Sequence, residues 1–204
     1  MKSDYIKLSV YNRIFQYMQY ENALCLRLCL ETGLRVGDAL KVKAEDIDGR
    51  TISYIAEKTG KAGKKVITQK LAKDLKRLSG GGGYCFKGRF GGDTHRTRQA
   101  VWNDVKKASK LAGVPANVSP HSTRKTYAVG LFHEKGIVET ERELQHDRLD
   151  TTLLYAFSDM LSGESKFDEK NNNDSKILFD TVYSACIKAL KDFFNKSEFT
   201  NSSL

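Results

Sequence analysis

In this 204-residue chain, the stretch TGLRVGDAL at residues 32–40 follows an apolar segment and marks the boundary between two predicted helices. Residues 21–31 include four leucines, which predicts a buried helix, and Gly33 is a plausible C-cap for it. A second short helix is expected over residues 36–42. Arg35 therefore stands between two helices, where a guanidinium that stays charged at physiological pH can hold two phosphate oxygens at once.

A second short stretch, HSTR at residues 121–124, has the same kind of chemistry. Ser119 and Pro120 predict the cap and first position of a helix that ends near Gly136. His121 and Arg124 are three residues apart, about one helical turn, so both side chains can point at one centre. A histidine titrates near neutrality and can move a proton, although a structural histidine or a surface ion pair is the plainer alternative for each residue alone.

The third stretch pairs His146 with Tyr155, nine positions later. A phenol has a reference pKa of about 10, so a tyrosine nucleophile needs nearby positive charge when it attacks phosphorus. Nine tyrosines are present, and most are expected simply to pack. Two arginines, two histidines and a tyrosine nevertheless fit one task, which is to hold and attack a phosphodiester.

Positive charge is concentrated in one part of the chain. The net charge is +9, and residues 51–110 alone carry 15 Lys and Arg against 4 Asp and Glu. A solvated lysine face is the plain interpretation of a basic stretch. Such a concentration of positive charge in one segment favours a polyanionic partner such as a nucleic acid, whose affinity for proteins comes mainly from neutralisation of its phosphates by Lys and Arg.

Taken together, these stretches resemble the catalytic domain of the tyrosine recombinase (phage integrase) family over roughly residues 5–160. The family's first arginine box resembles residues 32–40, its His-x-x-Arg box resembles residues 121–124, and its third box resembles residues 144–146 with 151–155. The family also has a lysine on a β-hairpin between the first two boxes. Lys58 is the best match for it, with Lys61 as the alternative.

The resemblance implies a site-specific recombinase that forms a 3′-phosphotyrosyl bond through Tyr155 and needs neither a metal nor ATP nor another cofactor. Integration, excision and inversion are all compatible with it. Arg35, Arg124 and His146 are implied to contact the scissile phosphate. Lys58 is implied to protonate the leaving 5′ oxygen, and His121 to assist proton transfer. Asp38 is a supporting residue that is expected to orient a neighbouring basic group.

The implied partner is double-stranded DNA at a specific site, bound by a homo-tetramer whose free form is a monomer or weak oligomer. The expected DNA contacts are basic or amide side chains, most of them in the charged segment: Lys61, Lys64, Lys65, Arg89, Arg96, Arg98, Gln99 and Lys125. The runner-up functions are a DNA-binding regulator with a relic recombinase domain and a type IB topoisomerase, which shares the tyrosine chemistry.

This chain departs from the family pattern in several places. Gln145 replaces the usual glycine, Asp38 stands where many members have glutamate, and Thr123 and Lys125 flank the second arginine where leucine and histidine are common. Only 34 residues precede Arg35, too few for the family's helical core-binding domain. The chain is therefore similar to short members such as the fimbrial phase-switch invertases, or it is a truncated form.

The expected fold is mainly α with a small antiparallel hairpin or three-stranded sheet, in a catalytic domain over residues 1–160. Strands are expected at 51–56 and 64–68, across a turn containing Gly60 and Gly63, and a basic helix at 70–78. A long helix is expected from a cap at Thr94 to Leu111, and shorter helices at 139–146 and 151–160. Residues 161–175 are predicted to be a linker before a C-terminal helix and tail at 176–204, which could pack in its own domain or dock on a neighbouring protomer.

The remaining composition points to a cytoplasmic protein. No run of about 18 apolar residues predicts a membrane span, and the first residues lack the apolar run of a signal peptide. Cys25 and Cys29 fall in the apolar segment, where small buried hydrophobic residues are expected rather than metal ligands.

Overall fold

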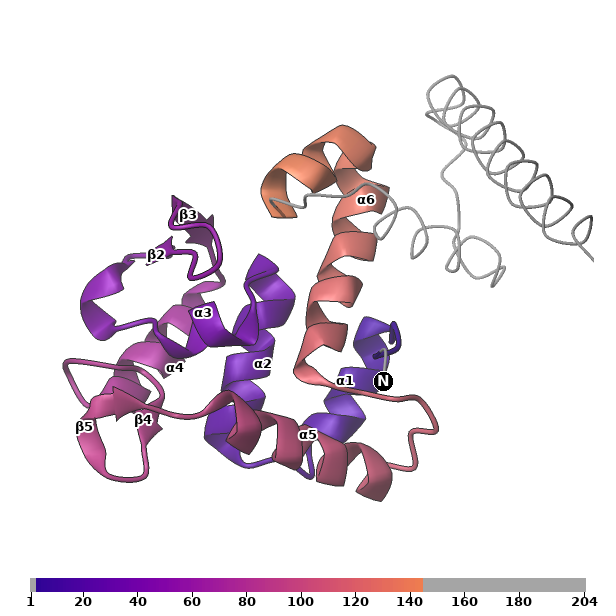
Figure 1. The fold of residues 1–204 in the computed structure, drawn as a ribbon, viewed down its shortest axis with the longest axis horizontal. Helices are drawn as coiled ribbons and strands as arrows, with labels where there is room; N and C mark the ends of the chain where they lie inside the picture. The colour runs from indigo at the N-terminus through magenta and orange to yellow at the C-terminus, as the bar shows by residue number, and fades with distance from the viewer. Residues whose placement is uncertain (1–2, 145–204) are drawn as a thin grey trace, which may run out of the picture. The chain divides into compact units, whose positions relative to one another are not determined.

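The structure is a computed structural model that describes residues 3–144, and it confirms the mainly helical class with small antiparallel sheets (Figure 1). The helices are α1 (Leu8–Phe15), α2 (Tyr20–Thr32), α3 (Val36–Leu40), α4 (Gln69–Ser79), α5 (Arg98–Leu111) and α6 (Pro120–Leu144), with a 3₁₀ turn at Ala44–Asp46. The strands are β1 (Ile47–Asp48), β2 (Thr51–Ile55), β3 (Ala62–Val66), β4 (Lys87–Gly88) and β5 (Gly91–His95).

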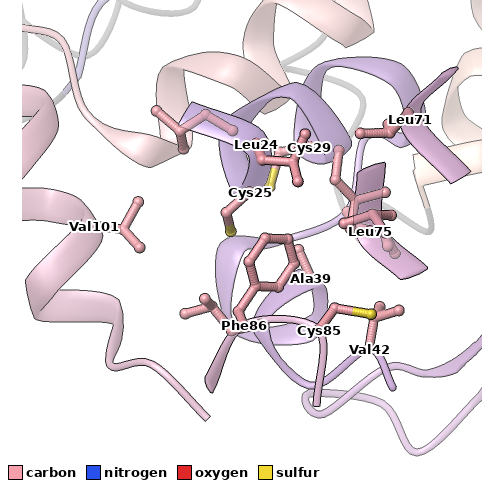
Figure 2. Packing of buried hydrophobic residues seen from close by; sticks show 14 of the residues in the cluster. Leu24, Cys25, Cys29, Ala39, Val42, Leu71, Leu75, Cys85, Phe86 and Val101 are labelled. Atoms are coloured by element: carbon pink, nitrogen blue, oxygen red, sulfur yellow. The ribbon is translucent and has the colours of Figure 1, made fainter. Parts of the chain in front are cut away.

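Helix α2 forms the centre of the core, which explains its continuous apolar sequence. Leu24, Cys25 and Cys29 are almost fully buried and pack with residues of α3, α4, α5 and the segment before β4 (Figure 2). The cysteines at 25, 29 and 85 are free thiols and buried, as expected for small hydrophobic residues. Because α2 is fixed on several sides, the residue that follows it is placed rigidly.

A three-stranded antiparallel sheet, in the order β1-β2-β3, carries the turn with Lys58. Strand β2 pairs with β3 from Thr51 opposite Val66 to Ile55 opposite Ala62. The expected position of Gly63 in the turn is wrong, because Gly63 lies within β3 opposite Tyr54. A Cβ atom at Gly63 would approach the Tyr54 ring to 2.7 Å, so the glycine makes room for that ring.

The segment before α5 differs from the prediction. Thr94 lies in β5, and the cap of α5 is Thr97, whose Oγ1 accepts a hydrogen bond from the N–H of Ala100 at 3.1 Å. The β4–β5 hairpin was not predicted. A hydrogen bond of 2.7 Å from the N–H of Arg96 to the carbonyl of the buried Phe86 closes the base of this hairpin.

Helix α6 begins as predicted and then changes direction. The Ser119 hydroxyl accepts a hydrogen bond from the N–H of His121, with Pro120 as the first helical residue. Gly136 has φ 76° and ψ −177°, values outside the helical region, so it ends the first part of the helix as expected. The helix expected at 139–146 is the part of α6 after this break, which reaches Leu144 (Figure 1).

Several predictions fall outside the described residues. These are His146, Tyr155, Gln145, the helix at 151–160, the linker and the C-terminal helix. Within the part of the chain that the structure describes, no helix has the length and apolar character needed to cross a membrane.

Candidate active site

One cavity brings together residues of the first arginine motif, the turn with Lys58 and the His-x-x-Arg motif. It has a volume of about 400 Å³ and is lined by the junction of α2 and α3, the β2–β3 turn, and the first turns of α5 and α6. Its lining includes five residues that were predicted for the site: Arg35, Asp38, Lys58, His121 and Arg124. Between the first and last of these lie 88 residues, so only the fold makes them neighbours.

Arg35 is placed by the tight connection after α2. Gly33 adopts the left-handed conformation at φ 69° and caps the helix through its N–H to the carbonyl of Cys29 at 2.9 Å. The hydroxyl of Thr32 accepts a hydrogen bond from the N–H of Leu34, and this bond stabilises the turn between α2 and α3. Arg35 is then the N-cap of α3, with its half-buried side chain lining the cavity.

Arg124 is buried, with only 6% of its surface exposed, and is held by backbone carbonyls. Its Nη1 donates to the carbonyl of Gly33 and its Nη2 donates to the carbonyl of Leu144, each at 2.5 Å. Burial, followed by the positive charge of Arg35, lowers the pKa of Arg124 to about 10, while Asp38 acts in the opposite direction. The two guanidinium groups therefore lie close enough to repel each other, as is expected at a site for an anion.

Asp38 is buried and supports the turn that carries Lys58. Its Oδ1 accepts a hydrogen bond from the backbone N–H of Glu57 at 2.9 Å. The sequence predicted that Asp38 orients a neighbouring basic group. The bond instead goes to the backbone of Glu57, the residue before Lys58. By fixing residue 57, the carboxylate fixes the position from which Lys58 enters the cavity.

His121 lies at the mouth of the cavity in strongly positive surroundings. Partial burial of its ring, followed by the charges of Lys125, Arg124 and Arg35, holds the pKa of His121 below its ordinary value. The imidazole is therefore neutral at pH 7 and can accept a proton.

Five of the predicted DNA contacts are exposed: Lys61, Lys64, Arg89, Arg98 and Gln99. Arg98, the first residue of α5, also lines the cavity. Lys58 lines it as well, which favours Lys58 over Lys61 as the lysine of the site.

The other three predicted DNA contacts have hydrogen-bond or ion-pair partners within the protein. Arg96 donates from Nη1 to the side chains of Gln19 and Asn22, at 3.0 and 3.1 Å, and so fastens the start of α5 to α2. Lys125 is buried, and its ammonium group binds the carbonyl of Ser3. Lys65 is also largely buried and pairs with Glu143. Each of these three cations therefore already has an acceptor within the described part of the protein.

Sequence reasoning missed the acceptors that orient Arg124. The carbonyls of Gly33 and Leu144 belong to the backbone, so residue type gives no signal for them. The partnership of Lys65 and Glu143, 78 residues apart, was also missed. Its only sequence signal was that Glu143 immediately precedes the third motif.

Comparisons with known proteins show the family to which the chain belongs. Residues 4–161 match the model of the phage integrase family. The chain is 30% identical over 133 residues to the integrase of Escherichia phage P2, covering 63% of this chain and 35% of that protein. It is 29% identical over 149 residues to the tyrosine recombinase XerD of Mycobacterium tuberculosis, covering 66% and 47%. The chain thus spans less than half the length of these two relatives.

Solved structures show the same fold. The chain matches a XerH site-specific recombinase bound to a difH substrate, in a post-cleavage complex, with a TM-score of 0.63 and 17% identity, covering 79% of this chain and 52% of that one. It also matches the catalytic domain of bacteriophage HP1 integrase with a TM-score of 0.58 and 19% identity, covering 84% and 98%.

Proposed function

The chain belongs to the phage integrase family, and from this premise we propose that it cuts and rejoins DNA strands at a specific site through a 3′-phosphotyrosyl intermediate. The observation that carries the proposal is the single cavity shared by Arg35, Lys58, His121 and Arg124. Two guanidinium groups, a lysine and a neutral imidazole around one centre are suited to a phosphodiester that gains negative charge during reaction.

The proposed reaction begins when the Tyr155 hydroxyl attacks phosphorus and the bond from phosphorus to the 5′ oxygen breaks. His121 or His146 takes the tyrosine proton, and Lys58 gives a proton to the departing 5′ oxygen. Arg35 and Arg124 stabilise the charge on the two non-bridging oxygens. A 5′ hydroxyl from another strand then displaces the tyrosine by the reverse steps. The phosphotyrosyl bond preserves the energy of the broken bond, so we propose that neither ATP nor a metal takes part.

We place the DNA over the cavity and over five exposed basic or amide side chains. Lys61 and Lys64 belong to the β2–β3 turn and to β3, and Arg89, Arg98 and Gln99 belong to the β4–β5 hairpin and the start of α5. The partner is proposed to be duplex DNA in the cytoplasm, and the active assembly a homo-tetramer. Integration, excision and inversion all use this chemistry.

The direct test is covalent trapping on a nicked DNA substrate. After cleavage the short fragment with the new 5′ hydroxyl diffuses away, so the adduct cannot be reversed. The full chain should become linked to the labelled strand, stay linked in denaturing detergent, and react equally in EDTA. Site-dependent adducts would separate this function from the general relaxation expected of a type IB topoisomerase. Binding without any adduct would instead indicate a regulator and overturn the proposal.

Replacement of Lys58 by alanine is expected to lower the rate of strand cleavage by about 10²–10⁴-fold, the usual contribution of a general acid. A substrate whose leaving 5′ oxygen is replaced by sulfur should restore most of that rate, because a thiolate leaves without a proton. Single-turnover cleavage of both substrates measures the effect. Lys61→Ala is the matched control, and a thiolate rescue of Lys61→Ala in place of Lys58→Ala would assign the role to Lys61.

The cleavage rate is expected to depend on pH through His121. Because the pKa of His121 lies below its ordinary value of 6.5, the neutral base is the major form at pH 7–8 and is lost as the pH falls through its pKa. The rate should therefore be flat from pH 7 to 8 and fall on the acid side. In His121→Gln the rate should be lower throughout and this fall should disappear. An unchanged acid limb in that variant would move the role to another base, such as His146.

A further inference from the structure

Lys65 lies beside both of the structural elements that orient Arg124. Its side chain is 10% exposed and its partner Glu143 is 31% exposed, so this is an enclosed ion pair rather than a surface contact. Lys65 belongs to β3 and Glu143 to the last turn of α6, which bends toward the β2–β3 hairpin (Figure 1).

The first connection passes through the end of α6. The Lys65 ammonium group pairs with the carboxylate of Glu143 and also donates to the backbone carbonyl of Glu143 at 3.3 Å. Leu144 is the next residue, and its carbonyl accepts from Nη2 of Arg124. Holding residue 143 at two points therefore limits where the carbonyl of residue 144 can lie.

The second connection passes through Tyr127 to Gly33. The Lys65 ammonium group is 5.7 Å from the centre of the Tyr127 ring, within the range of a cation–π contact. That ring is packed directly on Gly33, since a Cβ atom there would lie 2.4 Å from Cδ1 of Tyr127. The carbonyl of Gly33 accepts from Nη1 of Arg124.

The break at Gly136 explains why such support is needed. Arg124 lies in the first part of α6 and Leu144 at the end of the second, and Gly136 between them has a non-helical φ of 76°. A continuous helix would fix the two parts relative to each other, but a glycine outside the helical region does not. Contacts from β3 supply the constraint that the helix itself lacks.

We propose that Lys65 and Glu143 are positioning residues for Arg124. By fixing the carbonyls of Gly33 and Leu144, they set the orientation in which Arg124 meets the scissile phosphate. Neither residue touches DNA. The inference rests on the proposed function, and it assigns a role in the reaction to a lysine that the sequence placed on the DNA surface.

The test compares Lys65→Met and Glu143→Gln, which remove one charge each while keeping most of the side-chain volume. The single-turnover rate of covalent trapping should fall by about 10- to 100-fold, the usual cost of removing a supporting residue. Duplex affinity measured at matched salt should stay within about threefold. The matched control is Glu139→Gln, which removes a partner of the exposed ion pair with Arg142 in the same part of α6 and should leave both quantities unchanged.

A double-mutant cycle separates positioning from simple loss of stability. In an Arg124→Lys background, Lys65→Met should cause little further loss of rate, because the group that it positions is gone. In an Arg35→Lys background the losses should multiply. Lys65→Arg should retain most of the rate, and it keeps the inference testable if Lys65→Met folds poorly.

Equal losses in both backgrounds would overturn the inference, as would wild-type trapping rates in Glu143→Gln. Failure of the proposed function is distinguishable from these outcomes, because then the wild-type chain itself would form no adduct.

Discussion

Replacement of Tyr155 by phenylalanine is expected to abolish covalent trapping on a nicked substrate and to leave duplex binding nearly intact. In the proposed reaction the phenol oxygen is the atom that forms the bond to phosphorus, so the variant has nothing with which to form an adduct. Removal of a nucleophile costs at least about 10⁴-fold in rate in enzymes where it has been measured, which places any residual reaction below detection. Denaturing gels of labelled DNA and a binding assay on the same preparation would give both results.

A second tyrosine provides the control for this experiment. Tyr54 is the half-buried tyrosine of β2, and burial, followed by the charges of Asp38 and Glu143, raises the pKa of its phenol. A raised pKa makes the phenolate harder to form, so Tyr54 is a poor nucleophile. Tyr54→Phe should still form the adduct. Loss of the adduct in Tyr54→Phe with retention in Tyr155→Phe would reverse the assignment.

Replacement of Arg124 by alanine is expected to damage both catalysis and folding. Loss of one donor to the developing charge should lower the cleavage rate by about 10²–10³-fold. In addition, the carbonyls of Gly33 and Leu144 lose their buried partner. Each such loss costs roughly 1–3 kcal/mol of unfolding free energy. Single-turnover trapping and chemical denaturation measure the two effects separately.

Arg35→Ala is the informative comparison, because Arg35 lines the same cavity but is only half-buried. It should lower the rate as much as Arg124→Ala while costing less stability. An Arg124→Ala variant that is fully stable, or that cleaves at the wild-type rate, would contradict the role of Arg124 as a buried, carbonyl-held clamp.

Local signals in the sequence were sufficient for much of the helical framework. The αL conformation at Gly33, the cap at Ser119 with Pro120, and the break at Gly136 all follow from properties of single residues and their neighbours. The pairing of β2 with β3 was also predictable, since the two segments are joined by a short turn.

The failures concern features that depend on distant partners. Strand β4 has only two residues, so it shows no alternating pattern, and the β4–β5 hairpin begins and ends at the bonded residues Phe86 and Arg96, of which Phe86 is buried in the core. Thr94 and Thr97 are equally good caps by residue type, and the hairpin decides between them. In the same way, Lys65 and Lys125 resemble the exposed Lys61 and Lys64 in sequence. Their acceptors, Glu143 and Ser3, are 78 and 122 residues away.

The repulsion between Arg35 and Arg124 has a consequence for the proposed reaction. In the protein alone the two cations oppose each other, and this opposition adds to burial, the larger cause, in lowering the pKa of Arg124 to about 10. A bound phosphodiester with one negative charge would partly offset the repulsion between the two guanidinium groups. The species halfway through strand transfer has gained further negative charge and relieves it more completely. We therefore expect the cavity to bind the transition state of the proposed reaction more strongly than it binds unreacted DNA.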